Sequence, residues 1–449
     1  MIIKDKKISI IGAVRSGVAA AKLALAHGAI PFVSDSNTSE KLVDAEREFD
    51  QLKIQYEFGN HSKKVFDCDF IVTSPGVPSD SDVLVNAKSK DIPIYSEIEF
   101  ASWFCEGTII SITGSNGKTT TTTLLNYILN EAGYISYPAG NIGNALSGIV
   151  DKLNGNDFVS LETSSFQLDH INTFKPKFSV ILNITPDHLD RYENSFEKYK
   201  QAKLRIFENQ DENDFLILNA DDSSLSKLQI DSKVNRYFFS TKNKVENGAF
   251  CSDGKFIFVN NNVEEEICDC SELYIKGEHN RSNALAALIV AKLIGITNEK
   301  IKDAFASFKG VEHRLEFVRE IEGIKFINDS KATNVDSVWY ALQSFDTKIL
   351  LILGGKDKGN DYNLIKDLVK AKVKKIYAIG SSKDKVYDFF HDIVSVDKKE
   401  TMEDCVVAGR NEAEANEIVL LSPACASFDM FKNFEHRGEV FKQIVMSLN

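Results

Sequence analysis

Short apolar runs alternate with stretches of helical periodicity through most of the chain, and many of the apolar runs stop at a glycine or a polar cluster. Residues 7–11 form such a run, which stops at Gly12 and is followed by an alanine-rich helical pattern over 18–26. Two further runs cover 31–34 and 70–73. Strands that alternate with helices in this way predict a parallel, doubly wound α/β sheet at the start of the chain.

The same pattern restarts twice, so we predict three α/β domains, covering residues 1–96, 97–310 and 311–449. A length of 449 residues agrees with about three domains. In the second domain, a polar, strand-rich segment over 236–269 predicts an antiparallel excursion, and helical periodicity returns over 283–308. Further strands are predicted over 158–161, 180–184, 315–318, 324–327, 349–353, 376–379 and 418–421, with a helix over 335–345.

The most informative segment follows an apolar, β-branched run and reads GSNGKTT. Backbone N–H groups and the positive end of a helix dipole bind phosphates at a strand–loop–helix junction of this kind. In such a loop Lys118 reaches the outer phosphates and Thr119 binds Mg²⁺. The full pattern requires glycine where Ile112 stands, and the alternative is an ordinary glycine-rich turn. We favour a nucleoside triphosphate site formed by Gly114, Ser115, Asn116, Gly117, Lys118, Thr119 and Thr120.

Composition and charge narrow the function classes. Hydrophobic residues make up 43% of the chain and charged residues 26%, which is typical of a globular protein. The net charge of -12 argues against nucleic-acid binding, because such proteins carry basic surfaces. Seven scattered cysteines, of which only Cys268 and Cys270 lie close together, favour a reducing compartment. No apolar run approaches the roughly 20 residues that span a bilayer, and we expect no signal peptide and a cytoplasmic location.

Three polar residues of the second domain are candidate catalytic or metal-binding groups. Glu162 follows a strand beside the phosphate loop, where carboxylates bind the Mg²⁺ that bridges phosphates; the alternative is a helix-terminal residue near a cap. His188 follows the next strand, where it fits either a polar cleft or a merely structural or exposed histidine, and the local sequence favours neither. Lys203 lies in a helical run, and the local sequence favours a solvated surface lysine there. A carbamylated Lys203 would instead carry a carboxylate that binds Mg²⁺.

Polar loops also follow three strands of the third domain, and each brings a cation or a hydroxyl to the same edge of the predicted sheet. These loops are DSKATN (329–334), GGKDK (354–358) and SPACAS (422–427). Their Lys331, Lys358 and Ser427 together favour an anionic, dicarboxylate ligand. For each loop alone, simple solvation is the alternative.

Two residues near the start of the third domain fit either a ligand contact or a structural role. Arg314 stands at the domain boundary, where it fits either a phosphate clamp or an interdomain salt bridge. The polar loop that begins at Asp329 offers donors for a carboxylate or phosphate; the alternative is that Asp329 or Ser330 caps the helix that follows, and both roles are compatible.

The first glycine-rich turn, residues 12–17, is only a partial dinucleotide fingerprint because Val14 stands where a glycine is expected. Asp35 ends the next strand, a position at which ribose hydroxyls are often bound. The turn is therefore compatible with a weak nicotinamide site or with a nucleotide sugar diphosphate.

Taken together, these segments resemble the Mur ligases over essentially the whole chain. The segments that carry the resemblance are GSNGKTT (114–120), AGNIG (139–143), LETSSFQL (161–168), DHLDRY (187–192), KLRIFEN (203–209), HRLEF (313–317), NDSKATN (328–334) and SPACASFDMFKNFEHRG (422–438). The third-domain loops are the most specific, and they resemble the members that join D-glutamate to UDP-N-acetylmuramoyl-L-alanine. The absent phosphate-loop glycine is usual in this family.

The resemblance implies a Rossmann-like first domain that binds the UDP-substrate, a central P-loop-type ATP-binding domain with a mostly parallel sheet, and a Rossmann-like third domain that brings the amino acid. It implies ATP and two Mg²⁺ sites, one at Thr119 and Glu162 and one at His188 and a carbamylated Lys203. We also expect a monomer. The further ATP contacts that it implies are Asn280, Arg314 and Asp329, and the substrate contacts are Asp35, Asn141, Lys331, Thr333, Lys358, Ser427 and Phe434.

The implied reaction proceeds through an acyl phosphate, formed when the alanyl carboxylate attacks the γ-phosphate of ATP, which the D-glutamate amine then attacks. Two rivals remain. One is a related ligase for another amino acid, such as a folate-glutamate ligase, against which the NDSKATN segment argues. The other is a nucleotide-regulated binding protein or a nicotinamide-dependent enzyme, in which Glu162, His188 and Lys203 would have no evident role.

Overall fold

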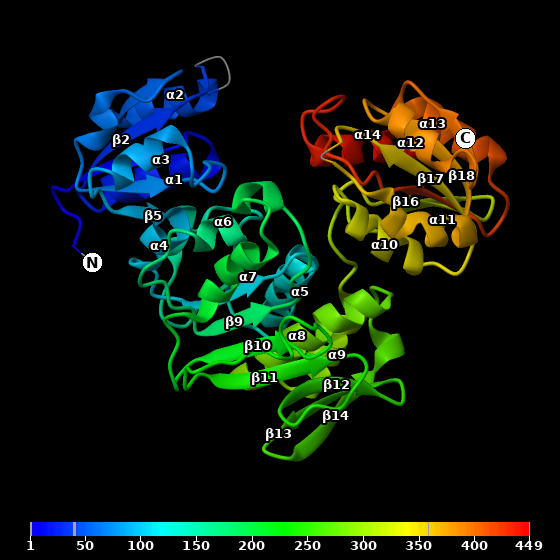
Figure 1. Cartoon of the computed structure of the whole chain (residues 1–449). Coiled ribbons are helices and arrows are strands. Elements are labelled where there is room, and N and C mark those ends of the chain that lie inside the picture. The colour runs from blue at the N-terminus through cyan, green and yellow to red at the C-terminus, as the bar shows by residue number, and fades with distance from the viewer. Residues whose placement is uncertain (1, 39–41, 358, 449) are drawn as a thin grey trace. The chain divides into compact units, whose positions relative to one another are not determined.

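The computed structural model describes residues 2–38, 42–357 and 359–448, which form three separate sheets flanked by helices (Figure 1). Two compact units are present. One holds the chain up to Leu273 together with Asn280–Phe308, and the other holds Tyr274–His279 and the chain from Lys309 onward. The predicted three-domain α/β class is confirmed by the three largely parallel sheets. The boundaries at residues 96 and 310 stay predictions.

The first sheet has five parallel strands in the order β3-β2-β1-β4-β5. Its strands are β1 (Lys7–Ile11), β2 (Ile30–Asp35), β3 (Gln55–Phe58), β4 (Phe70–Thr73) and β5 (Ile94–Ser96). The helices of this part are α1 (Arg15–Ala26), α2 (Val43–Leu52), α3 (Asp82–Lys88) and α4 (Glu97–Ser102), with a 3₁₀ turn η2 (Lys63–Phe66). Strands β1, β2 and β4 end side by side, so the turns after them share one sheet edge, where open α/β sheets bind ligands.

The second sheet has nine strands in the order β14-β13-β12-β11-β10-β9-β6-β8-β7. They are β6 (Thr108–Thr113), β7 (Ser136–Gly140), β8 (Phe158–Glu162), β9 (Phe178–Ile181), β10 (Phe215–Asn219), β11 (Asn235–Ser240), β12 (Gly248–Ser252), β13 (Lys255–Asn260) and β14 (Val263–Asp269). The accompanying helices are α5 (Lys118–Glu131), α6 (Ser165–Leu168), α7 (Phe196–Leu204), α8 (Glu278–Ile294) and α9 (Asn298–Ser307). Short 3₁₀ turns are η3 (Leu146–Gly148), η4 (Val150–Lys152), η5 (Leu189–Tyr192), η6 (Arg205–Phe207) and η7 (Cys270–Glu272).

The central strand β6 lies between β8 and β9, and this arrangement builds the site. Ile112 pairs with Glu162 on one side, and Thr113 pairs with Ile181 on the other. All three strands are parallel, so the segments that follow their carboxyl ends meet at one edge of the sheet.

The predicted antiparallel excursion over 236–269 is only partly correct. Strand β11 pairs in parallel with β10, and β12 pairs in parallel with β11. Antiparallel pairing begins with the tight β12–β13 turn and continues into β14. The parallel part of the sheet therefore extends further than the polar composition of the segment suggested.

The third sheet has six strands in the order β15-β16-β20-β17-β18-β19, and only the β15–β16 pair is antiparallel. The strands are β15 (Glu316–Ile321), β16 (Ile324–Asn328), β17 (Ile349–Gly354), β18 (Val373–Ile379), β19 (Ser395–Lys398) and β20 (Ile418–Leu421). The helices are α10 (Val335–Gln343), α11 (Lys366–Lys372), α12 (Lys383–Phe390), α13 (Met402–Glu412) and α14 (Phe434–Ser447), with a 3₁₀ turn η8 (Tyr362–Ile365). Because β16, β20 and β17 are neighbours, the loops after them converge.

Apolar side chains of the first two sheets belong to one continuous buried cluster, which includes Ile8 of β1 and Leu161 of β8. The third sheet has its own clusters on its two faces, represented by Leu351 and Leu350 of β17. Among the described residues, no helix combines the length and the apolar composition needed to cross a membrane.

Candidate functional site

The predicted phosphate loop joins β6 to α5. Lys118 is the first residue of the helix, and Gly117 before it adopts a left-handed conformation with φ 85°. A side chain at Gly117 would collide with Asn283 of α8, so only glycine fits this close approach. Ile112 is a buried strand residue, which explains the departure from the longer glycine pattern: here the strand extends to Thr113 and the loop begins at Gly114.

The loop is held in shape by residues that the sequence analysis did not select. The Ser115 hydroxyl donates to the carbonyl of Thr185 at 2.7 Å and lies 3.0 Å from the Tyr199 hydroxyl. The backbone N–H of Asn116 donates to Asn183 Oδ1 at 2.8 Å, and Asn183 Nδ2 returns a bond to Asn116 O at 3.0 Å. A signal for Asn183 was present, because it lies just beyond the end of the neighbouring strand β9.

Two lysine side chains converge on one carbonyl oxygen of this loop. Lys118 Nζ donates to Gly114 O at 2.7 Å and to Ser115 O at 2.8 Å, and Lys203 Nζ donates to the same Gly114 O at 2.9 Å. Burial, together with the nearby positive charge of Lys118, holds the pKa of Lys203 well below its ordinary value. This shift favours the uncharged, nucleophilic form of the Lys203 amine.

The prediction from local sequence that Lys203 is a solvated surface residue is wrong. Only 2% of Lys203 is exposed, and its Nζ lies 4.8 Å from the centre of the Tyr199 ring. Tyr199 and Lys203 are four positions apart on α7, so they share one face of the helix, and that face is turned inward.

Glu162 ends β8 and contacts the first turn of α5. Its Oε2 accepts a hydrogen bond from the Thr119 hydroxyl at 2.7 Å, and its Oε1 accepts one from Asn141 Nδ2 at 2.9 Å. A hydroxyl and a carboxylate so close together are the hard oxygen donors that Mg²⁺ prefers, so these two residues fit the ion. The helix cap that follows is Ser164, so Glu162 is a strand-terminal residue and not the helix-terminal residue of the alternative.

His188 follows β9 in an exposed position with φ 51°. Its Nε2 lies 3.7 Å from Asp187 Oδ2, and its ring packs edge-on against Phe166 at 5.4 Å. Asp187 also contributes a negative charge at Lys203, so the segment after β9 and the amine of Lys203 belong to one electrostatic environment.

Two further predicted ATP contacts lie on the helices that meet the loop. Thr120 is buried in the first turn of α5, and Asn280 is buried near the start of α8. Asn280 Oδ1 accepts a long hydrogen bond from Asn283 Nδ2 at 3.4 Å, and Asn283 is the residue packed against Gly117.

Asp35 is buried at the end of β2, where it organises the first glycine-rich turn. Its Oδ2 accepts from the backbone N–H of Ala13 at 2.7 Å, and its Oδ1 accepts from the N–H of Asn37 at 2.7 Å. A cavity of about 760 Å³ opens here, lined by Asp35, Arg15 and also by Asn141 from the second sheet. The structure thus brings two predicted substrate residues, Asp35 and Asn141, to one cavity.

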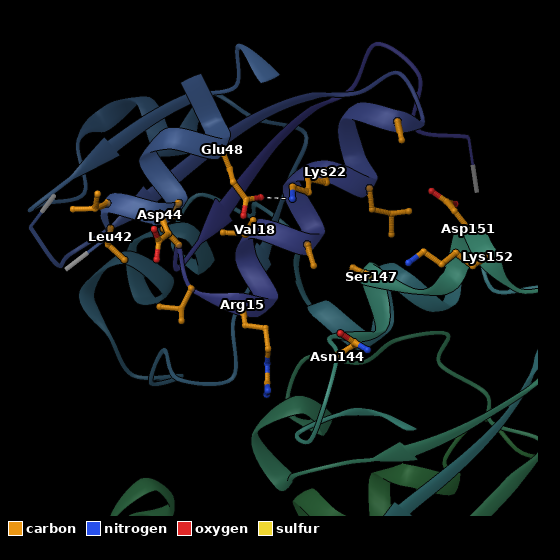
Figure 2. Close-up of a pocket in the computed structure, with 18 residues that line it drawn as sticks. Arg15, Val18, Lys22, Leu42, Asp44, Glu48, Asn144, Ser147, Asp151 and Lys152 are labelled. Atoms are coloured by element: carbon orange, nitrogen blue, oxygen red, sulfur yellow. Dashed lines mark ion pairs between the residues drawn. The ribbon is translucent and has the colours of Figure 1, made fainter. Parts of the chain in front are cut away.

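A second cavity, of about 860 Å³, lies beside α1, α2 and the 3₁₀ turns η3 and η4 (Figure 2). An ion pair between Lys22 and Glu48 connects the two helices within it. Its charged lining residues are Arg15, Lys22, Lys152, Asp44, Glu48 and Asp151. Three cationic and three carboxylate side chains therefore balance in the lining of this cavity.

The residues that are predicted to bind the amino-acid substrate lie at the carboxyl edge of the third sheet. Lys331 Nζ lies 4.8 Å from the centre of the Phe434 ring, and the backbone N–H of Thr333 donates to Lys331 O at 2.9 Å. Ser427 is buried in the loop after β20, which is adjacent to β16. Lys358, the remaining predicted contact, lies outside the described residues.

The sequence suggested that Asp329 or Ser330 caps α10, but neither does. Asn334 caps this helix, and its side chain accepts a hydrogen bond from the N–H of Ser337 at 2.9 Å. The Asp329 carboxylate accepts instead from Ser422 Oγ at 2.8 Å and from the N–H of Leu315 at 3.2 Å. Burial raises the pKa of Asp329 to about 6, against the opposing charge of Arg314. Arg314 and Asp329 are therefore electrostatic neighbours.

Arg437 is a buried positioning residue that the sequence analysis missed. Its guanidinium donates to Ser330 Oγ at 2.9 Å, to Ser330 O at 2.7 Å and to Cys425 O at 3.0 Å. It therefore ties the loop after β16 to the loop after β20. Arg437 lies on the amphipathic helix α14, and the sequence of this helix gave little indication that the charged side chain is buried.

Comparisons with known proteins agree with this arrangement. Residues 7–83 match the MurD N-terminal domain, residues 112–291 the Mur ligase middle domain, and residues 313–425 the Mur ligase glutamate ligase domain. The UDP-N-acetylmuramoylalanine--D-glutamate ligase of Chloroherpeton thalassium is 45% identical, with 99% of each chain covered. The ligase of the same name from Thermoanaerobacter pseudethanolicus is 44% identical, with 100% of each chain covered.

Solved structures with a similar fold include two ligases of Thermotoga maritima. UDP-N-acetylmuramate-alanine ligase MurC matches with a TM-score of 0.60 at 20% identity, over 98% of this chain and 99% of that one. MurF ligase, solved in complex with ADP, matches with a TM-score of 0.60 at 18% identity, over 93% and 95%. At these identities the likeness concerns the fold.

Proposed function

The chain belongs to the Mur ligase family, and from this premise we propose that it joins D-glutamate to UDP-N-acetylmuramoyl-L-alanine with the conversion of ATP to ADP and phosphate, in peptidoglycan precursor synthesis. The observation that carries the proposal is 45% identity over 99% of the chain to a ligase named for these substrates. The phosphate loop with its two converging lysines supports the ATP-dependent chemistry. We further propose that the enzyme acts as a monomer in the cytoplasm.

We assign the three substrates to the three predicted domains. The UDP-substrate binds through residues 1–96, where Asp35 shapes the first turn, and its muramoyl part reaches Asn141. ATP binds to the loop of residues 97–310, with Asn280, Arg314 and Asp329 as further contacts. D-glutamate binds through residues 311–449, at Lys331, Thr333, Lys358, Ser427 and Phe434.

The residues around the phosphate loop fit Mg²⁺ in two places. Thr119 and Glu162 would hold one ion, and His188 with a carbamylated Lys203 would hold the second. When bound, Mg²⁺ neutralises charge on the transferring phosphoryl group. The chain's own contribution is the loop's backbone N–H groups, the dipole of α5 and the ammonium group of Lys118.

The chemical sequence follows from the poor reactivity of a carboxylate. When an oxygen of the alanyl carboxylate attacks the γ-phosphorus, an O–P bond forms and the bond from the γ-phosphorus to the bridging oxygen breaks. ADP leaves with that oxygen, and the carboxylate becomes an acyl phosphate. The neutral amine of D-glutamate then attacks the carbonyl carbon, and phosphate leaves from the tetrahedral intermediate. Side chains that hold the amine close to the carbonyl and exclude water favour ligation over hydrolysis.

An amino-acid panel tests the proposal most directly. Phosphate release from ATP is expected only when UDP-N-acetylmuramoyl-L-alanine and D-glutamate are both present, and mass spectrometry should detect the ligated product. Equal turnover with another amino acid would indicate a sister ligase. Tight ATP binding without phosphate release under any combination would indicate a nucleotide-regulated binding protein.

Replacing Lys331 with alanine is expected to cause a selective defect in amino-acid binding. A charge-assisted hydrogen bond contributes roughly 1.5–3 kcal/mol, so the KM for D-glutamate should rise about ten- to a hundredfold. The KM for ATP should change far less, because Lys118 and its loop are on another sheet. Separate titrations of the two substrates measure this.

Lys325→Ala is the matched control for Lys331, since Lys325 is an exposed lysine on the preceding strand β16. It should leave both KM values unchanged. An equal rise in both values for Lys331→Ala would assign the residue to folding, and unchanged values would move the amino-acid pocket elsewhere.

A further inference from the structure

Two cysteine thiols face each other in the antiparallel part of the nine-stranded sheet. Cys251 lies on β12 and Cys270 begins η7 just after β14, and their Sγ atoms are 3.7 Å apart. Both are free thiols. Neither has a role in the proposed ligation. We propose that Cys251 and Cys270 form a redox-active dithiol, which closes to an intramolecular disulfide when the protein meets hydrogen peroxide.

The backbone around the pair is fixed by the sheet. Cys251 pairs with Phe256 across the β12–β13 turn, and Phe256 pairs in turn with Cys268. The N–H of Cys270 donates to Gly254 O in the same turn at 2.7 Å. A disulfide bond is about 2 Å long, so the sulfur atoms must approach by less than about 2 Å. Rotation of the two side chains, with small backbone shifts, can supply this movement without re-pairing of strands.

The local charges make one thiol the first to ionise. The hydrogen bond that Cys270 shares with Cys251 lowers the pKa of Cys270; burial opposes this effect, and the guanidinium of Arg281 adds to it. The same hydrogen bond raises the pKa of Cys251, and burial raises it further, with a smaller contribution from Asp221. Cys270 is therefore the thiolate that attacks the oxidant, and Cys251 is the partner that keeps its proton until the second step.

The two steps balance with hydrogen peroxide as the only co-reactant. The Cys270 thiolate attacks one peroxide oxygen, so an S–O bond forms, the O–O bond breaks, and the released hydroxide takes up the proton that Cys270 had lost. The Cys251 sulfur then attacks the Cys270 sulfenic acid. The S–S bond forms, the S–O bond breaks, and the leaving hydroxide takes the Cys251 proton. Two thiols and one peroxide thus give one disulfide and two waters.

The burial of the pair selects a small oxidant. Cys270 is 5% exposed, whereas Cys251 is partly exposed. Hydrogen peroxide is small enough to reach a sulfur as buried as that of Cys270, whereas burial hinders the approach of a bulky disulfide such as oxidised glutathione to this thiol.

The test is a brief treatment of the full-length, reduced protein with a small molar excess of hydrogen peroxide. The intact mass should fall by two hydrogen atoms, and two of the seven thiols should be lost on titration in denaturant. Peptide mapping should show a cross-link between Cys251 and Cys270, which dithiothreitol should reverse. Before oxidation, phenylarsine oxide, which bridges neighbouring thiols, should bind once per chain.

Cys251→Ser and Cys270→Ser should each abolish the cross-link and the arsenical binding, and the first remains informative if the second fails to fold. Cys405→Ser is the control, because Cys405 is a buried free thiol on α13, and it should behave like the unaltered protein. A cross-link between other cysteines, or oxidation to sulfinic acid without a mass loss of two hydrogens, would overturn the proposal. All readouts are independent of ligase activity.

Discussion

Replacing Lys203 with alanine is expected to reduce ligation below detection, and added formate or acetate is expected to restore part of it. In the proposed enzyme Lys203 would carry a carbamate, and its carboxylate would hold Mg²⁺ together with His188. Alanine removes both the nitrogen and the carboxylate that it carries. A small carboxylate can enter the space left by the buried side chain and supply the missing oxygens.

The structure gives a physical reason for carbamylation at this residue. Only an uncharged amine attacks CO₂. Lys203 is buried, and its Nζ and the Nζ of Lys118 donate to the same carbonyl oxygen, Gly114 O. Burial and this like charge lower the pKa of Lys203, which increases the fraction of uncharged amine at neutral pH. Removing dissolved CO₂ should therefore slow the unaltered enzyme, and bicarbonate should restore it.

Turnover assays with and without carboxylates measure the effect, and the mass of the intact protein under mild conditions reports the carbamate. Lys198→Ala is the control. Lys198 is an exposed lysine on the same helix as Lys203, and it forms an ion pair with Glu193. It should keep full activity. Full activity of Lys203→Ala would contradict the proposed metal site.

The parts of the fold that could be predicted from sequence are those that depend on local pattern. Several buried strands with a glycine or polar terminus were predicted correctly, because a run such as residues 109–112 has few alternatives beside a phosphate loop. The strand predicted over 180–184 overlaps β9 only at residues 180–181, and β7 and β10 were not predicted. The segment 236–269 was harder. Its strands carry many polar residues on an outer edge, and composition alone does not reveal whether neighbouring strands pair in parallel or antiparallel.

The residues that sequence reasoning misplaced are those whose partners are distant along the chain. Lys203 is buried by the loop at Gly114, and a helical pattern around one lysine cannot report that contact. Asp329 and Ser330 are short polar residues before a helix, which usually indicates a cap. Here their side chains bind Ser422 and Arg437, respectively, so Asn334 is left to cap α10.

Replacing Lys118 with alanine is expected to lower kcat about a hundredfold or more, which is the range seen when one electrostatic stabiliser of a transition state is lost. Its Nζ lies among the carbonyl oxygens of the loop at 2.7 and 2.8 Å, so the ammonium group is already positioned where the phosphates of ATP would bind.

The fold should persist, because Lys118 is only half-buried and its backbone, which begins α5, is unchanged. Thermal unfolding checks this. The substitution also removes a positive charge beside Lys203, so the pKa of that amine should rise in the variant and its carbamate should form less readily at a given CO₂ concentration. Added bicarbonate should consequently not restore turnover beyond a small factor, since the main loss is the missing charge on the transferring phosphate. Near-normal kcat in Lys118→Ala would remove this lysine from the catalytic assignment, and complete recovery with bicarbonate would mean that it acts only through Lys203.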